Sequence, residues 1–232
     1  MFQKLRKSKK LLLVAMACAT FAIAGCGSDT TKNAADNGNA VTWSETFDGT
    51  KTDFAVKSSP THAVSMSQAT TEMMLQLGLE DKMAGTAFKE EEIYPPLQAA
   101  YDKVKVLSDK WPSYEVFMSV KPDFATGWPD SFSKRAIPAD KMIAQKVNIW
   151  LPESMLSTKA DLETNFNDMI KLGEIFGVKS KAEEWVAGQR KTLAAIQDKL
   201  KDLPRKRVFI YDSEDGQPFT AFEGYTTNIL KL

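Results

Sequence analysis

The chain has 232 residues, of which 43% are hydrophobic and 26% charged, and its 30 basic and 30 acidic side chains cancel to a formal net charge of zero. This charge balance argues against a nucleic-acid binder, which would need a basic face. One histidine and two cysteines leave few side chains for a metal site or a thiol nucleophile, so we expect neither a metal centre nor an enzyme.

The first 25 residues have the pattern of a signal peptide. Basic residues precede the apolar run 11–24, whose roughly 14 residues are fewer than the roughly 20 that a membrane-spanning helix needs. The run ends in Ile23-Ala24-Gly25-Cys26, which resembles the lipobox of bacterial lipoproteins. We therefore predict a signal peptide at 1–25 and lipidation of Cys26. The alternative is an ordinary signal peptide followed by a chance cysteine.

Removal of residues 1–25 would change the charge of the chain. The segment contains five of the 30 basic residues and none of the acidic ones, which leaves a net charge of −5. The other cysteine, Cys18, would leave with it, so the mature chain would fold without an internal disulfide. Residues 26–41 are rich in Asn, Asp, Thr and Gly, and we expect them to form a flexible tether.

Residues 42–157 are predicted to form an amino-terminal α/β lobe. A hairpin over 41–56 comes first, with Asp48-Gly49 as its turn. Short apolar runs then alternate with helical patterns, which indicates βαβ units and a mostly parallel sheet. The predicted strands are 62–66, 82–87, 104–107, 123–127 and 147–151, and the predicted helices are 70–79 and 114–120.

Residues 158–204 are predicted to be a helical linker. One helix covers 158–176, with Gly177 as its stop, and a second covers about 180–203, with Ser180 and Glu183 as a capping box. The second helix would be roughly 33 Å long, which suits a rigid strut between two lobes. Residues 205–232 then begin a second α/β lobe with a strand at 207–211 and a helix from about Thr226, and we expect this lobe to be truncated.

The order of four stretches resembles one known family. They are Ala63-Val64-Ser65-Met66-Ser67-Gln68-Ala69-Thr70-Thr71-Glu72, Leu77-Gly78-Leu79-Glu80-Asp81-Lys82-Met83-Ala84-Gly85, Lys121-Pro122-Asp123-Phe124-Ala125-Thr126-Gly127-Trp128, and Arg207-Val208-Phe209-Ile210-Tyr211 with Pro218-Phe219-Thr220. They are similar to the solute-binding lipoproteins of ABC importers for iron–siderophore, haem and cobalamin. Gln68 stands where proline is usual in that family, and family members continue beyond residue 232 to complete the second lobe.

The resemblance implies a binding role without chemistry. It implies a lipid-anchored protein on the extracytoplasmic face of the cell membrane, which captures a metal chelate and delivers it to a permease. It implies no cofactor, and the net charge of −5 after removal of the signal peptide argues against a nucleic-acid partner. The other functions left open are a surface adhesion or sensor lipoprotein and a truncated, non-functional fragment.

Ligands of parallel α/β sheets bind beyond the carboxyl ends of the strands, so the candidate contacts are the residues that follow each strand. Residues at or just after the ends of the second and third strands include Thr86, Phe88, Asp109 and Lys110. The candidates chosen as ligand contacts are Ser67 and Gln68 after the first strand, Trp111 and Trp128 after the third and fourth, and Asp212 and Phe219 in the second lobe. The two tryptophans are the strongest, because flat chelates gain by covering rigid aromatic rings. The alternative for both is a core tryptophan.

Two further expectations concern charged residues. The resemblance implies that Glu115 lies on the outer surface and pairs with an arginine of the permease. The alternative is a solvated glutamate favoured by the helix dipole. Only Arg135, Arg190, Arg205 and Arg207 follow the signal peptide, and this scarcity favours a neutral or weakly charged chelate.

Overall fold

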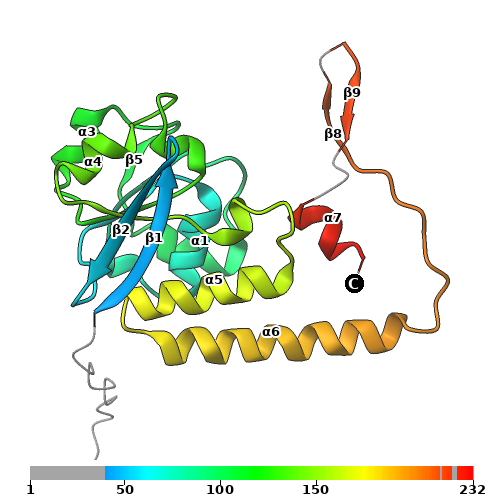
Figure 1. Cartoon of the computed structure of the whole chain (residues 1–232). Helices are drawn as coiled ribbons and strands as arrows, with labels where there is room; N and C mark the ends of the chain where they lie inside the picture. Colours follow the sequence, from blue (N-terminus) through cyan, green and yellow to red (C-terminus); the bar gives the residue numbers. More distant parts are fainter. Residues whose placement is uncertain (1–39, 215, 221–223, 232) are drawn as a thin grey trace, which may run out of the picture. The chain divides into compact units, whose positions relative to one another are not determined.

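The computed structural model describes residues 40–214, 216–220 and 224–231 (Figure 1). The predicted signal peptide, Cys26 and nearly all of the predicted tether lie outside these ranges. Among the described residues, none of the helices is both long enough and apolar enough to cross a membrane.

The described part of the chain begins with the predicted hairpin. Strand β1 (Val41–Phe47) pairs antiparallel with β2 (Thr50–Val56), in register from Val41 opposite Val56 to Phe47 opposite Thr50. Asp48 and Gly49 both have positive φ, of 47° and 78°, as a two-residue type I′ turn requires. The Asp-Gly signal is therefore confirmed. On the inner face, Trp43 stacks on its cross-strand partner Phe54, with ring centroids 5.6 Å apart.

The predicted parallel sheet is also confirmed, and it has five strands. They are β3 (Ala63–Ser65), β4 (Met83–Ala87), β5 (Val106–Ser108), β6 (Phe124–Thr126) and β7 (Asn148–Trp150). Their spatial order is β5-β4-β3-β6-β7, and every neighbouring pair is parallel. From β3 the chain adds β4 and then β5 on one side, and it returns to add β6 and β7 on the other side of β3. The loops after β3, β4 and β6 are therefore neighbours.

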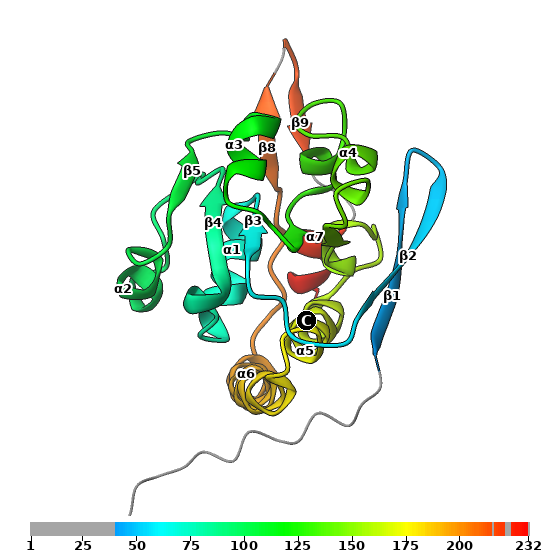
Figure 2. The ribbon, with the colours of Figure 1, turned by 90° about the vertical axis from the view of Figure 1, so that its left-hand side faces the viewer.

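Helices connect the strands (Figure 2). They are α1 (Gln68–Gln76), α2 (Gln98–Tyr101), α3 (Tyr114–Ser119), α4 (Ala139–Ile143), α5 (Leu162–Ile175) and α6 (Lys179–Leu200), with 3₁₀ turns η1 (Glu80–Lys82), η2 (Pro95–Leu97), η3 (Pro129–Phe132) and η4 (Glu153–Met155). The sequence patterns of α2 and α4 did not predict helices, because segments of four or five residues contain barely one helical period.

The core lies on both faces of the sheet, as the strand periodicity of two requires. Ala63 and Phe124 pack in one cluster with α1, α5 and α6, whereas their neighbours Val64 and Ala125 pack in the other with α3, α4 and the hairpin. All four are fully buried. Strands buried on both faces read as continuous apolar runs, which is why sequence patterns located them well.

The two linker helices lie side by side (Figures 1 and 2), but both begin differently from the prediction. Helix α5 begins at Leu162, where Asp161 and Thr164 form a capping box. Helix α6 begins at Lys179 after Val178, with no side-chain cap, so the Ser180–Glu183 capping box is wrong. The cause is Gly177, whose φ of +70° turns the chain early enough for the Val178 carbonyl to accept from Lys181 and Ala182.

The segment after α6 also differs from the prediction. Residues 204–210 form no strand, and β8 (Tyr211–Glu214) instead pairs antiparallel with β9 (Pro218–Thr220). Val208 and Phe209 are 63% and 70% exposed. An apolar run becomes a strand only where a partner is present, and in the described residues β9 offers one only to 211–214. Helix α7 (Tyr225–Ile229) follows close to its predicted start, and Asn228 Nδ2 donates to the Ala160 carbonyl (2.8 Å).

Candidate ligand-binding site

A buried network of hydroxyl groups fills the carboxyl ends of β3 and β4. Thr71 Oγ1 donates to Ser65 Oγ (2.8 Å) and lies 2.6 Å from Thr86 Oγ1. Ser67 Oγ accepts from the backbone N–H of Thr70 (3.3 Å), which makes Ser67 the N-cap of α1. All five side chains are essentially buried. The candidate Ser67 is therefore engaged in the turn from β3 to α1.

The candidate Gln68 fastens a loop onto α1. Its Oε1 accepts from the backbone N–H groups of Glu90 (2.9 Å) and Glu91 (2.7 Å). Its Nε2 donates to Glu72 Oε1 (2.9 Å) and to the Glu92 carbonyl (3.2 Å). A proline at position 68 could make none of these bonds. The departure from the usual family residue thus coincides with a pinned loop after β4.

The candidate Trp111 is half-buried and held at both ends. Its Nε1 donates to the Met66 carbonyl (3.1 Å), just beyond β3. Its ring stacks on Phe88, with centroids 4.6 Å apart and planes 29° apart. Phe88 follows β4 directly and has a φ of +59°, a conformation that is a genuine outlier for a bulky side chain. These contacts make a rigid pair of half-buried aromatic rings at the predicted edge of the sheet.

The loop that carries the candidate Trp128 is connected to the loop that carries Trp111 by hydrogen bonds to the same residue, Met66. It is half-buried, directly before η3, and its carbonyl accepts from the Ser131 backbone N–H (2.9 Å). Ser131 Oγ in turn donates to the Met66 carbonyl (3.3 Å), which also accepts from Trp111. A Cβ on Gly127 would lie 3.1 Å from Met66 Cβ, so the backbones approach closely here. The loops carrying the two tryptophans therefore meet at Met66.

The two candidates from the second lobe are not joined to this edge by any described contact. Phe219 lies in β9, opposite Ser213, with an exposed ring. Asp212 lies in β8, and its side chain is outside the described part of the structure. Their assignment to the ligand site stays a prediction.

Two buried carboxylates beside the sheet were missed by sequence reasoning. Glu45 on β1 is 7% exposed and accepts from the backbone N–H of Leu151 (3.0 Å). Asp168 on α5 is 4% exposed and accepts from Glu153 (2.8 Å) and Ser154 (2.9 Å). Together they hold the loop that follows β7. The sequence contained one clue to Glu45. It alternates with Trp43 and Phe47 on the inward face of β1, where a strand pattern predicts an apolar residue.

Burial perturbs the acidity of both groups. It raises the pKa of Glu45 to about 7, an effect that the Leu151 N–H opposes and that the nearby charges of Glu153 and Asp168 increase. Burial also raises the pKa of Asp168, against the stabilising bonds from Ser154 and Glu153. Burial therefore disfavours the charged form of both carboxyl groups that hold the loop after β7.

Glu115, the candidate docking residue, is exposed in the first turn of α3. Its own backbone N–H, the hydroxyl of Ser113 and the charge of Lys141 lower its pKa, in that order of importance. Ser113 caps the helix by accepting from Val116. A carboxylate that is ionised and accessible can pair with a guanidinium group.

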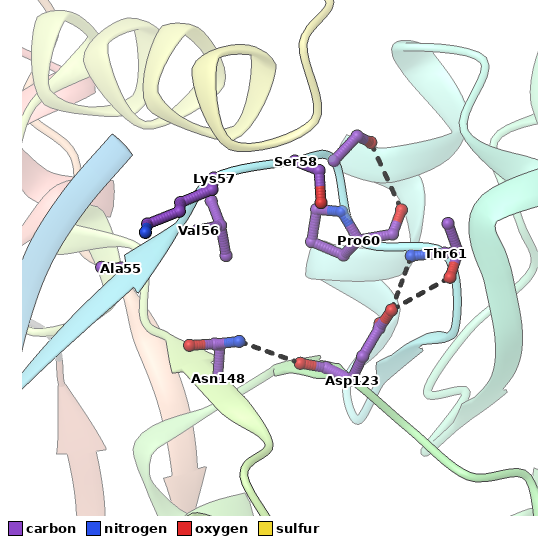
Figure 3. Close-up of a pocket in the computed structure, with 9 residues that line it drawn as sticks. Ala55, Val56, Lys57, Ser58, Pro60, Thr61, Asp123 and Asn148 are labelled. Carbon is purple, nitrogen blue, oxygen red and sulfur yellow. Dashed lines mark hydrogen bonds between the residues drawn. The ribbon is translucent and has the colours of Figure 1, made fainter. Parts of the chain in front are cut away.

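Two pockets lie elsewhere in the structure, and neither is lined by Trp111 or Trp128. One, of about 300 Å³, lies at the amino ends of β3, β6 and β7 (Figure 3), opposite the predicted ligand edge. There Asp123 accepts from the backbone N–H (2.8 Å) and hydroxyl (3.1 Å) of Thr61, and its carbonyl accepts from Asn148. The other, of about 620 Å³, lies between η2, α1, α5 and α6 and includes Trp185. Within the described residues, no cluster of three or more histidine, cysteine or acidic side chains could hold a metal ion.

The parallel five-stranded sheet and the long helix α6 give the chain a lobe of the periplasmic-binding-protein fold. Residues 64–228 match the family model described as periplasmic binding protein. The chain belongs to this family.

Two relatives extend further than this chain. A Bacillus subtilis (strain 168) protein named an uncharacterized ABC transporter substrate-binding lipoprotein, YvrC, is 26% identical over 223 residues, 93% of this chain and 67% of its own length. The crystal structure of a periplasmic binding protein from Veillonella parvula DSM 2008 is 95% identical, with a TM-score of 0.83 over 84% of this chain and 66% of that one. The chain thus spans about two thirds of the length of these relatives.

More distant solved structures share the fold. An ABC-type Fe³⁺-hydroxamate transport protein from Saccharomonospora viridis DSM 43017 is 20% identical, with a TM-score of 0.58 over 73% of this chain and 59% of that one. A haem-binding protein from Pseudomonas aeruginosa (22% identity, 70% and 56% of the chains) and a vitamin B12-binding protein from Vibrio cholerae (19%, 66% and 56%) have TM-scores of 0.52 and 0.51.

Proposed function

We propose that this protein is the substrate-binding lipoprotein of an ABC importer and that its ligand is a metal chelate of the iron–siderophore, haem or cobalamin kind. The observation that carries the proposal is the rigid Phe88–Trp111 pair at the carboxyl edge of the parallel sheet. Half-buried aromatic rings beyond parallel strands suit a large, flat ligand. The names of three solved structures, which concern Fe³⁺-hydroxamate, vitamin B12 and haem, support the same ligand class.

The proposed division of labour follows from the positions of the candidates. Trp111 and Trp128 contact the ligand directly, because both are half-buried at this edge. Gln68 contacts it or shapes the site by pinning residues 90–92, and Ser67 supports the turn beneath. Asp212 and Phe219 contribute from the second lobe. The protein does no chemistry on its ligand.

Membrane attachment and docking complete the proposal. Cys26 carries the lipid that holds the protein at the extracytoplasmic face of the cell membrane, and residues 26–41 serve as the tether. Exposed Glu115 pairs with an arginine of the permease. The relative named a substrate-binding lipoprotein supports this arrangement. A role as an adhesion or sensor lipoprotein has no comparable observation in its favour.

Calorimetric titration tests the proposal. The 232-residue chain is titrated with ferrichrome, ferric enterobactin, haemin and cyanocobalamin, and at least one is expected to bind saturably. The Trp111→Ala variant is expected to bind that ligand more weakly, while Trp185→Phe, on α6, serves as the control for losing a tryptophan elsewhere. Failure of all four chelates to bind the folded chain would refute the proposal.

A further inference from the structure

Phe88 is held in a strained conformation for which the fold alone gives no reason. Its φ of +59° falls in the left-handed region, which glycine adopts freely and a bulky side chain adopts at a cost. Glycine would serve the turn after β4 equally well. Strained residues of this kind concentrate at ligand sites, and what the strain achieves here is to lay the Phe88 ring on Trp111.

A cation accompanies the two rings. The Nζ of Lys110 lies 4.8 Å from the centroid of the Phe88 ring. Lys110 is exposed, and it forms no ion pair with any residue in the described ranges. The neighbouring Asp109 does not pair with it, and the charge of Asp109 acts on Tyr101, whose pKa it helps to raise. The ammonium group therefore keeps its three donors available to a ligand.

The three side chains are set on a rigid base. Trp111 is oriented by its bond to the Met66 carbonyl (3.1 Å), and the chain after Phe88 is fixed where Gln68 accepts from Glu90 and Glu91. Lys110 precedes Trp111 directly and so shares its support. A site that is already ordered loses little conformational entropy on binding.

We infer that Phe88, Lys110 and Trp111 form a subsite for an anionic aromatic group of the chelate, of which a metal-bound catecholate is the simplest example. The inference rests on the proposed function and makes it more specific. The flat ring of such a group covers the aromatic pair, and its phenolate oxygens accept charge-assisted hydrogen bonds from the Lys110 ammonium. This choice of ligand differs from the neutral chelate that the scarcity of arginine favours.

Competitive selectivity between two ferric chelates tests the subsite. Ferric enterobactin is anionic and aromatic, whereas ferrichrome is neutral and has no aromatic ring. Calorimetry on the 232-residue chain is expected to give tighter binding of ferric enterobactin than of ferrichrome. Lys110→Gln should weaken that binding roughly tenfold and should lower the preference for ferric enterobactin over ferrichrome, since the lost interaction is a charge-assisted hydrogen bond. Lys191→Gln, which removes an exposed lysine from α6, is the matched control.

A second variant tests the contribution of the Phe88 ring to binding without disturbing the fold. Phe88→Gly removes the ring at a position whose φ suits glycine, so the chain is expected to fold and to lose affinity for ferric enterobactin. If ferrichrome, haemin or cyanocobalamin binds but ferric enterobactin does not, or if neither variant weakens its binding, the inference is wrong and the proposed function stands. If no chelate binds, both are wrong.

Discussion

The buried carboxylate of Glu45 leads to a quantitative prediction about stability. Burial raises its pKa from the ordinary 4.5 to about 7 in the folded chain. Below pH 4.5 the group is protonated in both the folded and the unfolded chain, and no penalty arises. As the pH rises to 7, the unfolded chain loses this proton while the folded chain retains it, so the free energy of unfolding falls by about 3 kcal/mol. Above pH 7 the penalty is complete.

The substitution Glu45→Gln removes the ionisation and keeps a carbonyl oxygen that can accept from Leu151 N–H. At pH 4.5 the variant is expected to match the wild type or to be slightly less stable, because its buried amide needs partners for two donors. At pH 8 it is expected to be more stable by up to about 3 kcal/mol. Urea denaturation followed by circular dichroism at four pH values between 4.5 and 8 measures the difference.

Two results would refute this reasoning. One is a difference in stability between variant and wild type that stays constant over this pH range. The other is a variant that becomes less stable relative to the wild type as the pH rises, which would mean that the folded chain favours the charged form. Glu184→Gln, at an exposed position on α6, controls for the general effect of removing one negative charge.

Four further predictions concern docking, anchoring and two glycine positions. Glu115→Ala is expected to abolish ligand uptake in vesicles that contain the permease while the calorimetric affinity for the ligand stays unchanged, since the residue lies on the surface of α3. Cys26→Ser is expected to release the protein from the membrane fraction and to prevent palmitate labelling of the chain. Gly127→Ala should lower the free energy of unfolding by about 1–3 kcal/mol, because its Cβ would approach Met66 and Ser131 too closely. Gly188→Ala, an exposed helical position with open space around it, should instead raise it by up to about 1 kcal/mol in the same urea assay.

The elements of the fold follow closely from local sequence signals. The Asp48-Gly49 turn, the five apolar runs of the sheet and the two linker helices were all located from the sequence, because turn conformation and side-chain periodicity depend on near neighbours. The errors lie where local and non-local effects compete. The run at 207–211 has strand character, but pairing begins at Tyr211, where β9 supplies a partner.

The candidate site was predicted less completely. The rule that ligands bind beyond parallel strands led to Trp111 and Trp128, both of which are half-buried at that edge. The same rule could not separate them from Ser67, which follows a strand equally closely but is buried as a helix cap. Position along a strand is a local property, whereas exposure depends on what packs above it.

The sequence by itself determined the α/β class, the parallel sheet and the edge at which to look for a ligand, since these depend on residue periodicity and on a general property of parallel strands. Only the tertiary structure decided that Glu45 and Asp168 hold the loop after β7, and that Phe88, Lys110 and Trp111 come together. Each of these groupings joins segments from different strands or helices. Their contacts arise from the order of strands in the sheet and from one strained backbone angle, and neither is visible in a local pattern.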